Sequence, residues 1–180
     1  MARREIRPLR QDDFAELMKI EEEVFGAAGE GVLGAYYVRL CCEFFGETCF
    51  AALEEGRIVG YVLCFMKGRE AYCTTLAVAP GRQGSRVAVQ LLKALTGAIL
   101  ERADACWFTV KEDNLQARSL HAALGATELG FRDDFYGPGD RRLVSRIDVA
   151  AFERMRGRME RLGLVEREPA AALLPMQGAA

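Results

Sequence analysis

The chain has 180 residues, of which 51% are hydrophobic and 28% are charged, and its formal net charge is −2. These values are ordinary for one globular domain that buries a substantial core. A nucleic-acid-binding protein would more often be basic, which argues against that class. No stretch approaches the ~20 apolar residues of a membrane span, and the N-terminal residues lack the apolar segment of a secretory signal. The sequence therefore predicts a cytoplasmic protein with no membrane and no nucleic-acid partner.

Six cysteines are numerous for this length, but most of them lie inside apolar runs. Without a signal peptide, we expect them to be reduced and to pack as small buried hydrophobes. There is no C-x-x-C pair and the single histidine is distant in sequence, so no metal site is predicted. A redox role for the adjacent Cys41 and Cys42 is a second interpretation. The six are Cys41, Cys42, Cys49, Cys64, Cys73 and Cys106.

The first part of the chain has the patterning of a strand, two helices and three strands. Asp12 or Asp13 can cap the first helix, whose apolar face includes Leu17 and Ile20. The run 58–65 is apolar almost throughout, which predicts a central strand buried on both faces. In chain order we expect a strand at 4–9, the capped helix, a helix at 35–45, and strands at 48–53, 58–66 and 71–79.

The segment 74–95 is the most informative part of the sequence. A short apolar run, Leu76-Ala77-Val78, is stopped by Pro80 and followed by a turn-forming stretch at 81–85. Apolar residues then recur at helical spacing at Ala88, Leu91, Leu92, Leu95 and Ile99. A strand that runs through a glycine-containing loop into a helix leaves backbone N–H groups unpaired at the positive end of the helix dipole. Such a junction suits an anion such as a pyrophosphate, although a connection that binds nothing is the alternative.

The second part of the chain predicts a strand, a helix, two closing strands and a last helix. Asp113, with Gln116 three residues on, resembles a capping box and predicts a helix that ends at Leu124 and Gly125. The preceding helix is expected to end near Ala103. The remaining expectations are strands at 105–110, 127–131 and 141–147, a polar loop at 132–140, a mixed-charge helix at 149–162 and a disordered tail from 167.

This order of elements over residues 4–147 resembles the GNAT superfamily of N-acetyltransferases. The acyl-CoA motif of that family, V-x-P-x-x-[RQ]-G-x-G-x-[GA], is matched by residues 78–88, with Arg86 where the family usually has glycine. The second family element, N-x-x-A-x-x-L-Y-x-x-x-G-[FA], is matched by residues 114–126, with His121 in place of the tyrosine. The helix at 20–25 and the loop that contains Tyr136 are also similar to the subgroup that acetylates protein N-termini.

The resemblance implies an α/β fold with a mixed, mostly antiparallel central sheet flanked by helices, in the order β-α-α-β-β-β-α-β-α-β-β. The expected acetyltransferase domain covers 1–148, followed by an appended helix at 149–166 and a disordered tail at 167–180.

The resemblance also implies direct attack of a primary amine on the thioester of acetyl-CoA. The N–H of Val78 would stabilise the oxygen that gains charge. His121 would be the general acid, since a histidine near its ordinary pKa of ~6.5 is partly protonated at neutral pH; a histidine with no chemical role is the alternative. Tyr136 would contact the acceptor or only pack. The implied cofactor-binding residues are Leu76, Ala77, Val78, Gln83, Gly84, Ser85, Arg86, Val87, Ala88, Asn114 and Ala117.

The general base is left open. Relatives often place a glutamate on a central strand, but the corresponding positions here are Thr74 or Thr75, and Thr109, which cannot take a proton at neutral pH. A water chain or capture of the neutral amine serves equally well. The carboxylates near strand ends or in loops are Glu70, Glu112, Asp133 and Asp134.

The sequence also allows other functions, a different acyl donor and several kinds of acceptor. A non-catalytic acyl-CoA-binding or regulatory module, and an interaction protein whose loop binds no nucleotide, are the alternatives from other classes. A longer acyl donor is a close variant that depends on pocket volume. The acceptor, whether a small-molecule or a peptide amine, is not determined, and a homodimer is compatible with the sequence.

Overall fold

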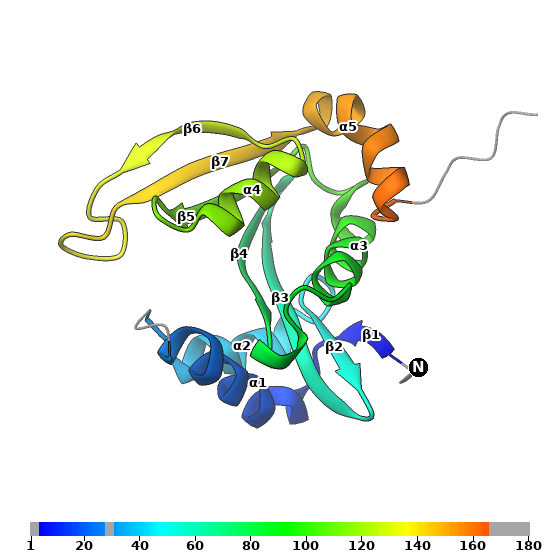
Figure 1. Cartoon of the computed structure of the whole chain (residues 1–180), viewed down its shortest axis with the longest axis vertical. Coiled ribbons are helices and arrows are strands. Elements are labelled where there is room, and N and C mark those ends of the chain that lie inside the picture. The colour runs from blue at the N-terminus through cyan, green and yellow to red at the C-terminus, as the bar shows by residue number, and fades with distance from the viewer. Residues whose placement is uncertain (1–3, 28–30, 166–180) are drawn as a thin grey trace, which may run out of the picture.

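The computed structural model describes residues 4–27 and 31–165 (Figure 1). The strands are β1 (Arg4–Pro8), β2 (Phe50–Glu54), β3 (Arg57–Lys67), β4 (Glu70–Val78), β5 (Ala105–Lys111), β6 (Thr127–Arg132) and β7 (Arg142–Asp148). The helices are α1 (Phe14–Glu21), continued by a π-helical turn (Glu22–Gly26), α2 (Ala35–Phe44), α3 (Val87–Ile99), α4 (Leu115–Ala123) and α5 (Val149–Leu162). The predicted order of strands and helices is confirmed.

Within the described residues, seven strands form one sheet in the order β1-β2-β3-β4-β5-β7-β6. In this sheet β4 and β5 are parallel, and the other neighbouring strands are antiparallel. The predicted mixed, mostly antiparallel sheet is therefore confirmed. The parallel pair is short, because only Glu70 to Tyr72 of β4 pair with Ala105 to Trp107 of β5. Beyond these residues the two strands diverge, as Figure 1 shows.

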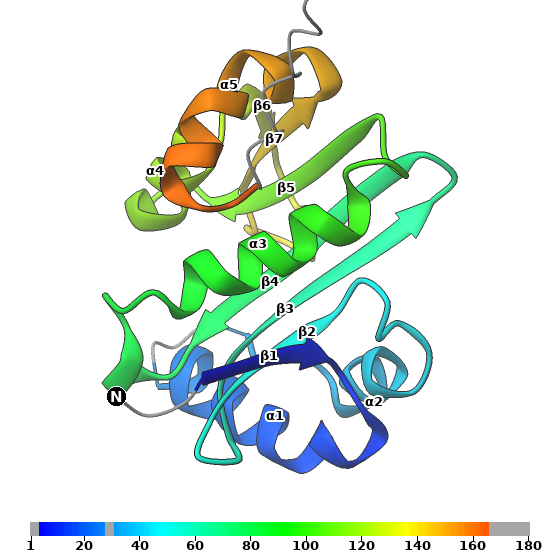
Figure 2. The same ribbon diagram turned by 90° about the vertical axis from the view of Figure 1, so that its right-hand side faces the viewer.

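Helices cover both faces of the sheet. Figure 1 shows α1 and α2 on one side of β3 and β4 and α3 on the other, and in Figure 2 α3 lies in front of β4. In β3, Tyr61 and Leu63 pack in the cluster that holds Leu17 of α1, while Val62 packs in the cluster that holds Leu91 of α3. Alternate residues of a strand point to opposite faces. β3 is thus buried on both faces, as its apolar run predicts.

Two predicted helix boundaries need correction. The N-cap of α4 is Asn114 rather than Asp113, because the side chain of Asn114 accepts a hydrogen bond from the N–H of Ala117 at 3.0 Å. Strand β5 extends to Lys111, so Asp113 lies within the turn that follows and α4 begins one residue later than predicted. Helix α3 ends at Ile99 and not near Ala103, and a turn follows it.

The last helix, α5, begins after Asp148, whose side chain accepts a hydrogen bond from the N–H of Ala151 at 2.8 Å. It ends at Gly163, which adopts the left-handed conformation with φ of 72°. The division into a domain at 1–148 and an appended helix at 149–166 stays a prediction. The predicted disorder of 167–180 lies outside the described residues.

The described residues also test the predictions made for the cysteines, for a metal site and for a membrane span. All six cysteines are buried and unpaired, as predicted. In the part of the chain that the structure describes, no group of three or more His, Cys, Asp or Glu side chains could hold a metal ion. None of the described helices has the length and apolarity needed to cross a membrane.

Candidate active site

The central feature of the site is the fork between β4 and β5. Leu63 of β3 pairs with Thr75 and Cys64 pairs with Cys73, so Thr74 is an extra residue in β4 and forms a β-bulge. A bulge bends its strand and increases the local twist. The bulge lies just past the last residue pair between β4 and β5. From Cys73 onward, the edge of β4 that faces β5 has no strand partner in the described structure.

Two N–H groups of β4 point into this fork. The N–H of Ala79 donates to the carbonyl of Val59 at 2.9 Å, and hydrogen-bonded pairs alternate along an antiparallel ladder. Ala77, two residues earlier, is therefore also bonded to β3, and the N–H groups of Leu76 and Val78 face the other way. The N–H of Val78, the predicted oxyanion donor, therefore points into the fork and has no strand partner within the described residues.

The loop between β4 and α3 presents further unpaired N–H groups. Gly84 has φ of 75°, a conformation that favours glycine. The hydroxyl of Ser85 accepts a hydrogen bond from the N–H of Val87 at 3.3 Å. The N–H groups of Gly84, Arg86 and Ala88 make no hydrogen bond within the described residues. These donors lie at the N-terminus of a 13-residue helix, so the loop fits a diphosphate.

Side chains from the rest of the sheet hold this loop. Glu54 at the end of β2 forms ion pairs with both Arg82 of the loop and Arg4 of β1. The side-chain amide of Gln83 donates to the carbonyl of Val78 at 3.3 Å. Because Gly60 of β3 has no side chain, the start of α3 can approach the sheet closely. The loop is therefore fixed to the sheet at several points.

Arg86 interacts with a part of the chain that the sequence did not connect to the loop. It is the N-cap of α3, with ordinary φ and ψ of −78° and 8°, so the usual glycine is not needed there for backbone conformation. Its guanidinium lies 3.7 Å from the place a Cβ of Gly163 would occupy. Gly163 ends α5, and the C-terminus of a helix attracts cations. The end of α5 thus lies beside the loop between β4 and α3.

The packing of α5 extends from this loop to α4. Leu164, just after α5, is 4% exposed and belongs to one buried cluster with Leu92 of α3 and Leu124 after α4. The sequence predicted α5 as a solvated helix or a packing appendage and missed its position beside the loop. The available signal was the apolar spacing of Phe152, Met155 and Met159 within the charged helix, the three being apolar neighbours of that cluster or members of it.

His121 lies on the inner face of α4, against β5 and β7. Its ring centroid is 4.5 Å from that of Phe108, and its Nδ1 is 3.3 Å from the hydroxyl of the buried Ser145. Burial lowers the pKa of His121 to about 4, against a smaller opposing effect of the Glu128 carboxylate. His121 is therefore neutral at pH 7, and the expected partial protonation is wrong. Asn114, the cap of α4, uses its side-chain oxygen within the helix.

The opposite face of the fork carries hydroxyl groups. Tyr72 of β4 lies between two of them, with its hydroxyl 2.8 Å from that of Thr109 on β5 and 3.2 Å from that of Tyr136. The hydroxyl of Tyr37 on α2 is 2.7 Å from that of Thr74. Burial raises the pKa of both Tyr37 and Tyr72 well above the ordinary value. These groups stay protonated at neutral pH and act as hydrogen-bond partners.

This hydroxyl cluster (Tyr37, Tyr72, Thr74, Thr109 and Tyr136) contains the predicted acceptor residue, Tyr136. Sequence reasoning missed Tyr72, although a signal was present: Tyr72 and Thr74 alternate along β4 as Trp107 and Thr109 do along β5, and alternate residues share a face. Phe108 points to the other face, with His121. The predicted general acid, His121, and the residue predicted to contact the acceptor, Tyr136, therefore lie on opposite faces of the fork.

None of the four carboxylates considered as a general base contacts this hydroxyl cluster within the described residues. Each is instead engaged elsewhere, and the partners are the indole of Trp107 for Glu70, the guanidinium of Arg141 for Glu112 and Asp133, and the N–H of Gly139 for Asp134. The hydroxyl groups of the cluster therefore have one another as their described partners, and none of these four carboxylates.

Comparison with known proteins identifies the family of this fold and site. The sequence pattern of the acetyltransferase (GNAT) family matches residues 13–126. The chain belongs to the acetyltransferase (GNAT) family. This GNAT protein is an acyltransferase with acetyl-CoA as its acyl donor, as its sequence predicted.

Individual relatives of this GNAT protein include one curated sequence and many solved structures. It is 26% identical to a [ribosomal protein bS18]-alanine N-acetyltransferase of Haemophilus ducreyi over 153 residues, which cover 82% of this chain and 99% of the relative. It is similar in fold to the diaminobutyrate acetyltransferase EctA of Paenibacillus lautus in complex with L-2,4-diaminobutyric acid and coenzyme A, with a TM-score of 0.70, 19% identity and coverage of 82% and 96%. The ribosomal-protein-S18-alanine N-acetyltransferase of Escherichia coli matches with a TM-score of 0.67, 18% identity and coverage of 82% and 94%.

Proposed function

We propose that this GNAT acetyltransferase acetylates the α-amine at the N-terminus of a peptide or protein. The observation that carries the proposal is the hydroxyl cluster, whose hydroxyl groups form no hydrogen bond with a carboxylate within the described residues. The carboxylate of Asp140, which accepts from the backbone N–H of Tyr136, is paired with Arg142. Only a neutral amine can attack. At pH 7 roughly 10% of an α-amine with a pKa of ~7.9 is neutral, against roughly 0.04% of a lysine side chain with a pKa of ~10.4. A site whose hydroxyl groups contact no carboxylate base within the described residues therefore favours an α-amine.

Relatives agree with an amine acceptor of this kind. The curated relative and the E. coli structure are named for acetylation of an alanine of a ribosomal protein. The Paenibacillus structure is named for a small diamine acid, so a small-molecule amine is the second candidate acceptor.

For the donor, we propose that the unpaired N–H groups of the loop from Gln83 to Ala88 hold the diphosphate of acetyl-CoA. The edge of β4 at Leu76 and Val78 would then lie along the pantetheine, with the N–H of Val78 directed at the thioester oxygen. When bound, acetyl-CoA supplies an acyl carbon that is open to attack by the amine. A backbone donor at the position where charge develops typically contributes a factor of about 10²–10³ in rate.

For His121, we propose the role of a neutral hydrogen-bond donor in place of the predicted general acid. We propose that the hydroxyl of Ser145, 3.3 Å from Nδ1, donates to it, which places the proton of the neutral ring on Nε2. This Nε2–H would then donate a hydrogen bond to the departing sulfur. Since a hydrogen bond to a charged group contributes ~1.5–3 kcal/mol, the expected effect is a factor of about 10 to 150 in kcat.

The acceptor proposal is tested with two peptides of one sequence that contains a single lysine. In one the α-amine is free and the lysine is acetylated; in the other the α-amine is acetylated and the lysine is free. We expect release of CoA thiol and a gain of one acetyl group, by mass spectrometry, with the first peptide. Equal or faster reaction of the second peptide, or reaction of L-2,4-diaminobutyric acid while neither peptide reacts, would refute the N-terminal α-amine of a peptide as acceptor.

Compartment and assembly are also proposals. Six buried unpaired thiols support a cytoplasmic location, because thiols persist in reducing compartments. A homodimer stays a prediction that the measured mass in solution would test.

A further inference from the structure

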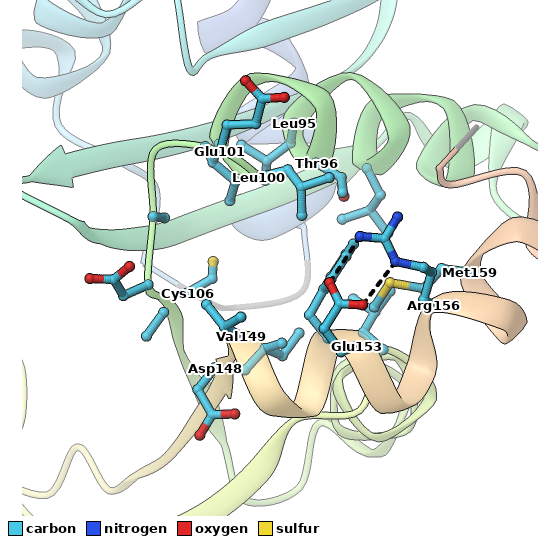
Figure 3. Close-up of a pocket in the computed structure, with 18 of the residues that line it drawn as sticks. Leu95, Thr96, Leu100, Glu101, Cys106, Asp148, Val149, Glu153, Arg156 and Met159 are labelled. Atoms are coloured by element: carbon cyan, nitrogen blue, oxygen red, sulfur yellow. Dashed lines mark hydrogen bonds and ion pairs between the residues drawn. The ribbon is translucent and has the colours of Figure 1, made fainter. Parts of the chain in front are cut away.

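A cavity of about 340 Å³ lies between α3, β5 and α5, on the same face of the sheet as His121. Figure 3 shows side chains from these three elements converging on it. Its inner lining is apolar and includes Leu92, Leu95, Phe108, Leu124 and Met159. An apolar cavity of about 150 Å³ is enough to bind benzene, so this one holds a considerably larger apolar group than the methyl of an acetyl.

One lining residue of the cavity, Phe108, lies next to the closed end of the β4–β5 fork. The last residue pair between these strands is Tyr72 with Trp107, and Phe108, one residue further, lines the cavity. The ring of Phe108 also stacks on His121, which is proposed to contact the departing sulfur. Leu92, a second lining residue, belongs to the buried cluster against which Leu76 of β4 packs. Phe108, Leu92 and Leu76, which connect the proposed thioester position with the cavity, are therefore all apolar.

The outer end of the cavity is charged. Glu101, Asp104 and Glu153 line it and are exposed. The cations beside them are engaged, since Arg156 donates to Glu153 at 2.9 Å and Arg69 pairs with Asp104 at 2.7 Å. This mouth offers a poor partner for the carboxylate of a free fatty acid, so an apolar chain fits best when it enters from the fork.

We propose that the cavity is an acyl-chain pocket and that this acetyltransferase also accepts saturated acyl-CoA donors of about six to eight carbons. The proposal rests on the placement of the thioester in the fork given under Proposed function. The chain would run past Phe108 toward Leu95 and Cys106. The amine nitrogen forms a bond to the acyl carbon and loses a proton, the carbon–sulfur bond breaks, and the thiol of CoA takes up the proton.

The test compares binding of acetyl-CoA and octanoyl-CoA to the full chain by isothermal titration calorimetry. Because each buried methylene favours binding by roughly a factor of four, we expect octanoyl-CoA to bind at least about tenfold more tightly. Thr96 lines the cavity from α3 and is only partly buried. We expect Thr96→Phe to remove most of this advantage while acetyl-CoA binds as before, and Thr96→Ala to keep it.

Cys106→Phe fills the cavity from β5 and gives a second, independent variant should Thr96→Phe fold poorly. Two results would overturn the acyl pocket and leave the acetyltransferase function intact. In the first, octanoyl-CoA binds the unaltered chain no more tightly than acetyl-CoA does. In the second, octanoyl-CoA binds both phenylalanine variants as tightly as it binds the unaltered chain. Failure of both donors to bind would instead refute the placement of the donor, and the pocket with it. Octanoate measured alone identifies binding that does not depend on the CoA portion.

Discussion

The low pKa of His121 makes the stability of this protein depend on pH in a defined window. Burial lowers the pKa in the folded state to about 4, whereas in the unfolded chain it is ~6.5. The unfolded state therefore binds more protons as the pH falls, and the contribution of His121 is complete above pH ~6.5 and lost progressively toward pH ~4. Between pH 8 and pH 5, linkage gives a loss of ~2 kcal/mol in the free energy of unfolding.

The experiment is equilibrium unfolding in urea at pH 8, 6.5 and 5, for the unaltered chain and for His121→Phe. The variant has no imidazole to protonate, so its free energy of unfolding should fall by ~2 kcal/mol less over this range; carboxylates contribute equally to both proteins and cancel. Ser145→Ala is the matched control. If burial is the cause of the low pKa, this variant should follow the unaltered chain.

A direct measurement of the pKa is also available. His121 is the single histidine of the chain, so its imidazole resonance in NMR needs no assignment. A folded-state titration near 6.5, or an equal loss of stability in the unaltered chain and in His121→Phe, would refute the reasoning. Either result would restore a protonated His121 as a general acid near neutral pH.

Three further changes test the scaffold of the site. In Gly60→Val, the new Cβ would lie 2.8 Å from the carbonyl oxygen of Ala77. We therefore expect the free energy of unfolding in urea to be ~1–3 kcal/mol lower and acetyl-CoA to bind more weakly. Unchanged binding would contradict the close packing of α3 against β3. Asn114→Ala should cost ~1 kcal/mol through loss of the α4 cap, and Asn114→Asp should retain it. Asp13→Asn breaks the ion pair that Asp13 forms with Arg7 at 2.6 Å, in which the side chain of Asp13 is 6% exposed and that of Arg7 is 13% exposed. This change should lower the free energy of unfolding by ~3 kcal/mol or more. A decrease below ~1 kcal/mol would show that the pair is solvated.

Most of the fold was predictable because each element carries its own pattern. The apolar run of β3, the helical spacing after the loop and the glycine at position 84 are local signals, and local backbone preference agrees with the final structure at each of them. The unpaired N–H groups of the loop between β4 and α3 were predictable for the same reason, since these donors belong to consecutive residues. The cap of α4 was misplaced by one residue, because Asp113 and Asn114 are both good caps and the length of β5 decides between them.

The sequence by itself determined the order of the elements, the two buried faces of β3 and the glycine-containing loop that leads into α3. Only the tertiary structure decided the pKa of His121, the gathering of hydroxyls around Tyr72, and the position of α5 beside Arg86. The physical reason is that periodicity shows which face of a helix or strand is apolar but not which partner covers it. Burial, and every property that burial controls, depends on contacts between residues far apart in the chain.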